Sequence, residues 1–278
     1  MERAVLKPRI ILTLCALGLW CASAHGQRLW GRSAGSVGSG GLTSTSLYCA
    51  SEGVNPSGPA YVGRLTVTAS VVVPYGLAEL AETSGAAILP AKLCVVTVKV
   101  GASGNEWSRF ATFGADVSRR FGRVAIGIGY RGLTHKLRFS ESGRSSMTIC
   151  GASFRPDERW EIGVAARNIE GRRLKRGGEE TRLGRTLWAS AKWRAPRVFG
   201  IGAEMEKESG KDAAAHVGVW LEPGGGLRFT AGFSTSGAEI GAGAGYERET
   251  WGVRAGVAHH QHLGVSGGAA ITFHPDWP

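Results

Sequence analysis

The chain has 278 residues, 43 of them glycine, with 20% charged residues and a formal net charge of +11. This length allows one large core or one sizeable barrel. The sequence after residue 25 has no apolar run near the roughly 20 residues of a membrane helix, so a membrane protein of this composition would have to be a β-barrel. Lys and Arg are scattered singly, except at 172–176, which does not favour nucleic acid as a partner.

The first 24 residues are typical of a secretory signal peptide. Three basic residues lie near its start: Arg3, Lys7 and Arg9. An apolar run over 10–20 follows, and the small residues at 22–24 predict cleavage after Ala24. The alternatives are an uncleaved anchor or a lipoprotein attached through Cys21, although the bulky Trp20 disfavours lipidation. Residues 1–24 therefore predict an exported protein of a Gram-negative envelope.

Residues 25–60 differ in character from the rest of the chain. They are rich in Gly and Ser and contain two prolines, which predicts an irregular N-terminal periplasmic arm. Beyond the signal peptide the cysteines are Cys49, Cys94 and Cys150. An odd and widely spaced set of cysteines predicts neither a disulfide framework nor a zinc site.

From Tyr61 onward, apolar residues alternate with polar or small ones in segments of about ten residues. In the segment 123–131, Val124, Ile126 and Ile128 share one face, and Arg123 and Arg131 lie on the other. The same alternation recurs in later segments: 160–168, 227–234, 239–247, 251–257 and 263–273. Turn residues separate these segments, as in hairpins. We therefore expect residues 61–278 to form about 14 antiparallel strands (12–14), most of them near the 9–11 residues of a tilted membrane strand.

The strands of a soluble sandwich would also alternate between apolar and polar residues, with the apolar face inward. The residues on the two faces of these strands favour a transmembrane barrel instead. Aromatic residues lie near strand ends, as an interfacial girdle requires: Trp107, Tyr130, Trp160, Trp193, Trp220, Tyr246 and Trp251. The opposite face carries the candidate lumenal polar residues: Arg123, Arg131, Glu161, Arg167, Arg228, Glu239 and Arg254. The predicted fold is all-β, a closed antiparallel transmembrane barrel with its apolar face in lipid.

Three motifs suggest chemistry, and each also has a structural interpretation. The stretch 127–132 matches GxGxxG, but a second alternating segment follows it where a helix would be needed, so we expect no cofactor. His259, His260 and His262 resemble a metal cluster, yet no Cys, Asp or Glu lies nearby, and a barrel rim explains them better. Ser266 with His260 or His262 would imitate a lipase dyad. We predict no catalytic, cofactor-binding or metal residues.

Several short segments resemble a known family. Residues 46–48 and 53–56 resemble the N-terminal Asn-Pro-Ala segment of PorV-type outer-membrane proteins, with Ser57 in place of alanine. Further stretches resemble the same family in the same order: 74–80, 160–168, 216–223, 227–233 and 260–266. That family is distantly similar to the FadL-type fatty acid transporters. The resemblance implies a barrel of about 14 strands with an N-terminal segment inside it as a plug. It also implies the candidate plug residues: Asn55, Pro56, Pro74 and Gly76.

The first functional hypothesis is a non-enzymatic, PorV-like outer-membrane component of secretion or envelope assembly. The alternatives are a FadL-like passive transporter of hydrophobic small molecules and an outer-membrane lipid hydrolase. The expected partners are outer-membrane lipid and either a secretion-system partner or a hydrophobic solute, with no cofactor and no nucleic acid. The basic run at 172–176 predicts a solvated loop or a loop that meets lipopolysaccharide phosphates.

Overall fold

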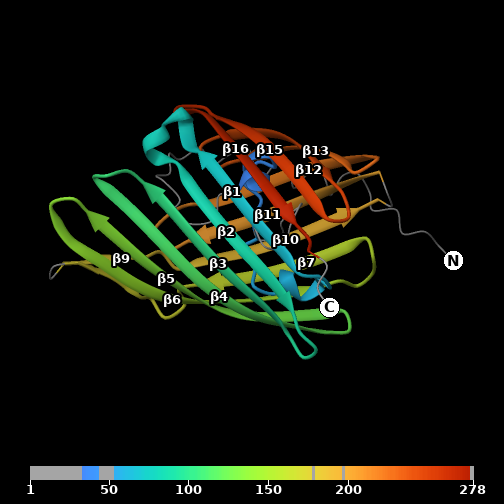
Figure 1. Cartoon of the computed structure of the whole chain (residues 1–278), viewed down its shortest axis with the longest axis horizontal. Coiled ribbons are helices and arrows are strands. Elements are labelled where there is room, and N and C mark those ends of the chain that lie inside the picture. Colours follow the sequence, from blue (N-terminus) through green and yellow to red (C-terminus); the bar gives the residue numbers. More distant parts are fainter. Residues whose placement is uncertain (1–32, 44–52, 177–178, 196–197, 276–278) are drawn as a thin grey trace.

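The computed structural model describes residues 33–43, 53–176, 179–195 and 198–275 (Figure 1). The predicted signal peptide, residues 1–24, lies outside the described residues. Fourteen strands form the barrel wall: β1 (Thr66–Val73), β2 (Glu82–Pro90), β3 (Val95–Gly104), β4 (Ser108–Phe121), β5 (Val124–Leu137), β6 (Ser140–Phe154), β7 (Trp160–Arg167), β10 (Thr186–Arg194), β11 (Phe199–Glu208), β12 (Ala213–Gly224), β13 (Leu227–Ser234), β14 (Glu239–Glu247), β15 (Trp251–His260) and β16 (Gly264–Phe273).

Every pairing in the wall is antiparallel, and the sheet closes on itself. Each strand pairs with its neighbours in the chain, β1 pairs with β16, and β7 pairs with β10 across a longer connection. That connection contains a short hairpin of β8 (Arg173–Arg176) and β9 (Glu179–Arg182), which continues the wall beside β6 beyond the end of β7. The predicted fold, a closed antiparallel transmembrane barrel of 14 strands, is confirmed.

The two ends of the barrel differ in their connections. One end, here called the short-turn end, holds the start of β1, the end of β16 and brief turns such as 122–123 and 225–226. The other end, the long-loop end, holds the loop 74–81 and the connection 168–185 with its hairpin. In the loop 74–81, two 3₁₀ turns, η3 (Pro74–Gly76) and η4 (Ala78–Leu80), join β1 to β2. No helix in the described ranges is long and apolar enough to cross a membrane.

The alternation along each strand puts apolar side chains on the outer surface and polar ones inside. Ile128 on β5 is 59% exposed and Val257 on β15 is 54% exposed, although both lie in the middle of a strand. The buried inward positions carry mostly Ser, Thr, Asp, Glu, His and Arg. This is the reverse of a soluble sandwich and is the arrangement of a barrel whose outer face meets hydrocarbon.

One aromatic residue expected in the girdle faces inward instead. Trp220 is only 4% exposed, and its ring fills the space that Gly200 leaves on the neighbouring strand β11. The girdle prediction for Trp220 is therefore wrong, because a glycine on the adjacent strand gives the ring room inside the barrel. Three other girdle candidates lie at the short-turn end in close ring pairs: Trp193 packs against Phe199, and Tyr246 packs against Trp251.

The described part of the N-terminal arm lies inside the barrel. Helix α2 (Ala34–Gly38) is buried along its whole length and packs on β14, β15 and β16. Ser33 and Ser36 form a capping box at its start. The wall can approach this closely only because it is lined with glycine. A methyl group at Gly256 would lie 2.7 Å from both the Ala34 carbonyl oxygen and the Gly38 nitrogen, and one at Gly241 would overlap the Val37 carbonyl oxygen.

Candidate functional site: the plugged lumen

The second described piece of the arm, residues 53–61, is tied to the wall by Asn55. The side chain of Asn55 is 3% exposed, and its amide nitrogen donates to the carbonyl oxygens of Ala152 on β6 and Val164 on β7, both at 3.3 Å. Its amide oxygen accepts hydrogen bonds from the Ser57 backbone nitrogen (3.0 Å) and hydroxyl (2.8 Å). Pro56 is buried beside it, against the wall at Gly127. The amide nitrogen of Asn55 therefore ties this piece to the inner wall of β6 and β7, while its amide oxygen fixes Ser57, whose hydroxyl donates to the Ser153 hydroxyl on β6 at 3.0 Å.

Pro74 and Gly76 do not join Asn55 in the lumen. They belong to η3, in the loop at the long-loop end, where the Tyr75 backbone nitrogen donates to the Ser266 hydroxyl at 3.0 Å. Tyr75 and Gly76 both have positive φ, at 56° and 71°. The structure therefore places the predicted plug residues Pro74 and Gly76 in a loop at the barrel end, because β1 is complete at Val73 and the chain must reverse there.

The hydroxyl and imidazole of the lipase-like alternative are part of the same loop region. Ser266 accepts the Tyr75 hydrogen bond, and His260 lies edge-on to the Tyr75 ring with 5.7 Å between centroids. The Nδ1 atom of His260 accepts from the backbone nitrogens of His262 and Leu263, at 3.1 and 3.2 Å. These contacts hold a turn and a loop in place.

The first plug piece is fastened at its far end by two adjacent strands. The Thr43 backbone nitrogen and hydroxyl donate to the two carboxylate oxygens of Glu204 on β11, at 3.1 and 3.0 Å. His216 on β12 has its Nδ1 atom 3.2 Å from the Gly40 carbonyl oxygen. Glu204, Glu206 and His216, all buried, offer ligand atoms within 4.8 Å of one another and so could hold a metal ion. The predicted residues do not include this cluster, although two glutamates spaced by two residues on a strand share a face.

On the opposite wall, three charged side chains link strands β3, β4 and β5 to the plug. Arg131 forms a bidentate pair with Asp116, whose side chain is fully buried, and the Nη2–Oδ2 distance is 2.8 Å. Lys99 lies 3.5 Å from the same carboxylate and donates to the Gly53 carbonyl oxygen at 2.7 Å. The sequence identified Arg131 as lumenal but not its partners, since the partner of an inward charge depends on the register between strands.

A cavity of about 150 Å³ lies between the plug and the wall, on the side toward the long-loop end. Its lining includes Val54 of the plug, Lys99 and Arg131 of the wall, and Ile149 on β6. The inward positions Gly101 and Gly114 widen it, and its lining also includes two outward-facing residues of the same strands, Val100 and Phe113. The cavity therefore combines polar anchors with apolar surface, in a stretch of wall thinned by glycine.

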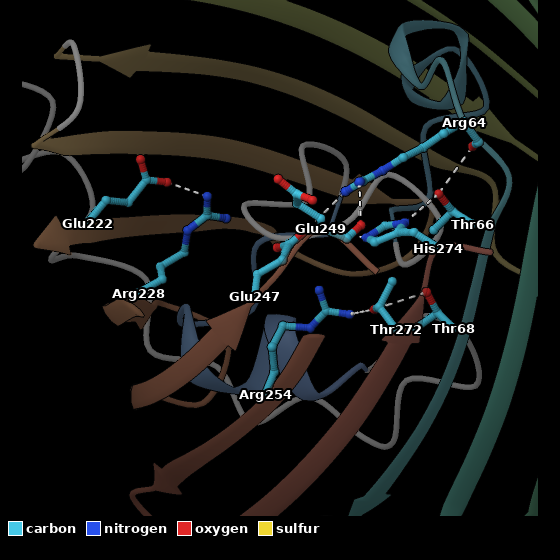
Figure 2. A network of polar contacts seen from close by, with 10 residues as sticks. All are labelled: Arg64, Thr66, Thr68, Glu222, Arg228, Glu247, Glu249, Arg254, Thr272 and His274. Carbon is cyan, nitrogen blue, oxygen red and sulfur yellow. Dashed lines mark hydrogen bonds and ion pairs between the residues drawn. The ribbon is translucent and has the colours of Figure 1, made fainter. Parts of the chain in front are cut away.

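The short-turn end carries a second, more charged cavity of about 480 Å³. Figure 2 shows four of its lining side chains, Glu222, Arg228, Glu247 and Arg254. Glu222 on β12 pairs with Arg228 and, at 3.0 Å, with Arg194. Arg254 on β15 donates to the Thr272 hydroxyl, which lies 3.3 Å from the hydroxyl of Thr68. The two predicted lumenal arginines Arg228 and Arg254 thus share one cavity, with carboxylates and hydroxyls as partners.

The remaining predicted lumenal residues lie in different places. Glu161 faces inward near the short-turn end, 2.7 Å from Arg155 and 3.1 Å from Lys192. Arg167 donates to the Thr186 hydroxyl at 3.1 Å, and Glu239 is buried on β14. Arg123, by contrast, is exposed in the turn between β4 and β5, so it does not line the barrel interior.

His274 lies just beyond the end of β16, and its surroundings at this end should make the stability of the protein depend on pH. Its ring lies 3.1 Å from the Thr66 hydroxyl and 3.4 Å from Glu247 (Figure 2). Burial, followed by the positive charge of Arg64, lowers the pKa of His274 below its usual value near 6.5. The folded state then binds fewer protons than the unfolded state, so this contribution to stability is present above about pH 6.5 and is lost as the pH falls below it.

We therefore expect His274→Gln to reduce the loss of stability between about pH 7 and pH 5. The measurement is the midpoint of urea unfolding in detergent at each pH, for the variant and the wild type. His259→Gln, at an exposed position of the β15 strand at the other end, is the control. An unchanged pH dependence in His274→Gln would contradict the expectation.

The fold and its plugged lumen define the class of this protein: a 14-stranded transmembrane barrel with an N-terminal plug. No family model and no curated protein sequence matches the chain. Solved structures do match in fold. The toluene transporter TodX of Pseudomonas putida has a TM-score of 0.63 at 9% identity, covering 90% of this chain and 99% of that one. A FadL homologue of Pseudomonas aeruginosa has a TM-score of 0.61 at 11% identity, covering 90% and 100%.

The outer-membrane protein Omp33 of Acinetobacter baumannii also matches, with a TM-score of 0.51 at 11% identity, covering 76% of this chain and 98% of that one. At these identities the likeness shows the fold. The expected resemblance to PorV-type proteins is not shown by these matches.

Proposed function

We propose that this protein is a non-enzymatic outer-membrane barrel that gives small hydrophobic molecules a passive path through its lumen. The observation that carries the proposal is the cavity of about 150 Å³ between the plug and the wall. A cavity of this size can hold one aromatic ring, and ligand sites typically combine apolar surface with a few polar anchors. The solved structures that share the fold include a toluene transporter and a FadL homologue, which favours this function over a secretion role.

The ends of the barrel support an orientation for this path. Barrels of outer membranes have short turns on the periplasmic side and longer loops outside. We therefore propose that the long-loop end faces the exterior and that the short-turn end, with the cavity of about 480 Å³, opens to the periplasm. A solute would enter above the plug, among residues of β1 to β5, and would have to pass the plug to reach the charged cavity. The exported, cleaved N-terminus predicted from residues 1–24 is part of the same proposal.

Filling the cavity of about 150 Å³ between the plug and the wall should block the path of the solute. Ser84 lies on β2, faces the lumen opposite Ser70 and lines the cavity. We expect Ser84→Trp to reduce the uptake of toluene into proteoliposomes to near the rate of protein-free vesicles, because an indole ring occupies a volume similar to that of the solute. The measurement is uptake of labelled toluene over time.

The matched control is Ala244→Trp, which puts the same ring on the outward face of β14. It should fold and transport as the wild type does. Wild-type protein that transports no faster than empty vesicles would contradict the proposed function itself. Transport that survives in Ser84→Trp would instead show that the solute bypasses this cavity.

A further inference from the structure

A group of basic side chains gathers on the outer surface at one corner of the long-loop end. We call this group the basic corner: Arg109 on β4, Lys136 on β5, Arg144 on β6, Arg173 and Lys175 on β8, and Arg182 on β9. All six are exposed, with the side chain of Lys175 at 77%. The β8–β9 hairpin that contributes three of them extends the wall at this corner; Figure 1 labels β9 beside β5 and β6.

The strand register sets like charges directly against each other here. Arg109 lies opposite Lys136, Arg144 opposite Lys175, and Arg173 opposite Arg182. Like charges at directly opposed positions of an antiparallel pair destabilise a sheet. Three such pairs on adjoining strands cost the sheet stability unless negative charge neutralises them, which favours an anionic ligand at this corner.

Few carboxylates of the protein neutralise this corner. Glu180 on β9 pairs with Arg173 at 2.9 Å and with Lys175 at 3.4 Å, and the hydrogen bond from Arg173 is the main cause that lowers the pKa of Glu180. Among the residues that the structure describes, Arg109, Lys136 and Arg144 form no ion pair. Most of the positive charge therefore faces outward, toward whatever surrounds the barrel.

The other face of the hairpin explains why these charges stay in place. Leu174, between Arg173 and Lys175, is buried and packs over Gly143 of β6. With Leu174 turned toward the barrel, alternation turns Arg173 and Lys175 outward, onto the same face as Arg144. The hairpin is thus held against the wall by an apolar contact and not by its charges.

The height of the corner matches the headgroup level of a membrane. The outward face of β5 is apolar from Val124, at the short-turn end, to Tyr130, and becomes basic at Lys136. The twelve residue-to-residue steps from Val124 to Lys136 span about 40 Å of strand at about 3.3 Å per residue. With a tilt of about 40°, they rise roughly 30 Å, just beyond an apolar band about 25 Å tall.

We propose that the basic corner binds the phosphate groups of phosphorylated lipid headgroups in the outer leaflet. A phosphate carries up to two negative charges and several acceptor oxygens, which suits opposed Arg and Lys side chains one strand apart. The cations face sideways from the wall at headgroup level, where a lipid can reach them. This inference rests on the membrane orientation of the proposed function, and its test uses lipid binding, which is independent of solute transport.

The variant for the test is Lys136→Gln with Arg144→Gln and Lys175→Gln, and the probe is a bisphosphorylated lipid A in neutral detergent. Without the lipid, the triple variant should melt at the same temperature as the wild type or higher, because like-charge repulsion is relieved. With the lipid, the wild type should gain stability and the variant should gain much less. The expected loss of lipid affinity is about fivefold for each charge removed.

Lys207→Gln is the matched control, since Lys207 is an outward lysine at the same end of the barrel, opposite Leu187 and Ala213. It should bind the lipid as the wild type does. Dephosphorylated lipid A should bind neither protein well, and inorganic phosphate alone should raise the wild-type melting temperature less than the lipid does. Equal stabilisation of wild type and triple variant by the lipid, or a variant that melts lower without it, would overturn the proposal.

Discussion

We expect Asp116→Asn to destabilise the barrel by about 3–5 kcal/mol, because it removes the charged partner of a buried ion pair. The Asp116 side chain is fully buried and pairs with Arg131 and Lys99, so its loss leaves two cations in the lumen without their shared carboxylate. The measurement is the midpoint of guanidinium unfolding in detergent, followed by the gel mobility of the folded barrel.

Two further variants make the Asp116 result specific. Glu106→Gln breaks an ion pair with Arg138 that is 3.4 Å long and largely exposed, and should change the stability by about 1 kcal/mol or less. Adding Arg131→Met to Asp116→Asn should restore part of the loss, since it removes one of the stranded cations. If Asp116→Asn were as stable as Glu106→Gln, the cluster would be solvated in the lumen and not buried.

The fold was predictable because one period governs it. A strand in a barrel wall has lipid on one side and the lumen on the other, so each residue's environment follows from its parity, and Val124, Ile126 and Ile128 could be assigned correctly without a structure. Trp220 follows the same parity, since it alternates with the exposed Val219 and Leu221, but the girdle prediction placed it by its nearness to a strand end and not by its face. Gly200 of the next strand leaves the room that its ring needs inside the barrel. The strand number was accessible for the same reason, since each turn interrupts the alternation.

The site was only partly predictable. Inward charges such as Arg131 and Arg254 could be assigned to the lumen from their parity alone, whereas their partners follow from register and from the course of the plug. Thr43 meets Glu204 from 161 positions away. Pro74 and Gly76 show the converse case, since the structure places them in a loop at the barrel end and not beside Asn55. A resemblance over short segments matches residues in sequence order, but it does not determine whether the loop between two strands lies inside the barrel or at its end.

The plug makes a second strong prediction, on permeability. Gly256 faces the first plug piece, and a side chain there would lie 2.7 Å from the Ala34 carbonyl oxygen, a contact with backbone that cannot rotate away. We expect Gly256→Val to weaken the seating of residues 34–38 by at least about 1–3 kcal/mol. The strand hydrogen bonds of β15 stay intact, so the wall should still close while the plug leaves its seat. Single-channel recording in planar bilayers should then show ion conductance where the wild type stays near baseline.

The control lies on the adjacent strand, where the same substitution meets nothing. Gly267 pairs with Val257 of β15 and faces outward, and a side chain built there has no atom within 4 Å. Gly267→Val should therefore conduct as little as the wild type and unfold at a similar denaturant concentration. If Gly256→Val folded and conducted no better than Gly267→Val, the plug would not be what closes the lumen, and a solute would have to pass somewhere other than between the plug and the wall. Conductance in Gly256→Val alone would instead show that the contact between α2 and the glycine-lined wall sets the permeability of the resting barrel.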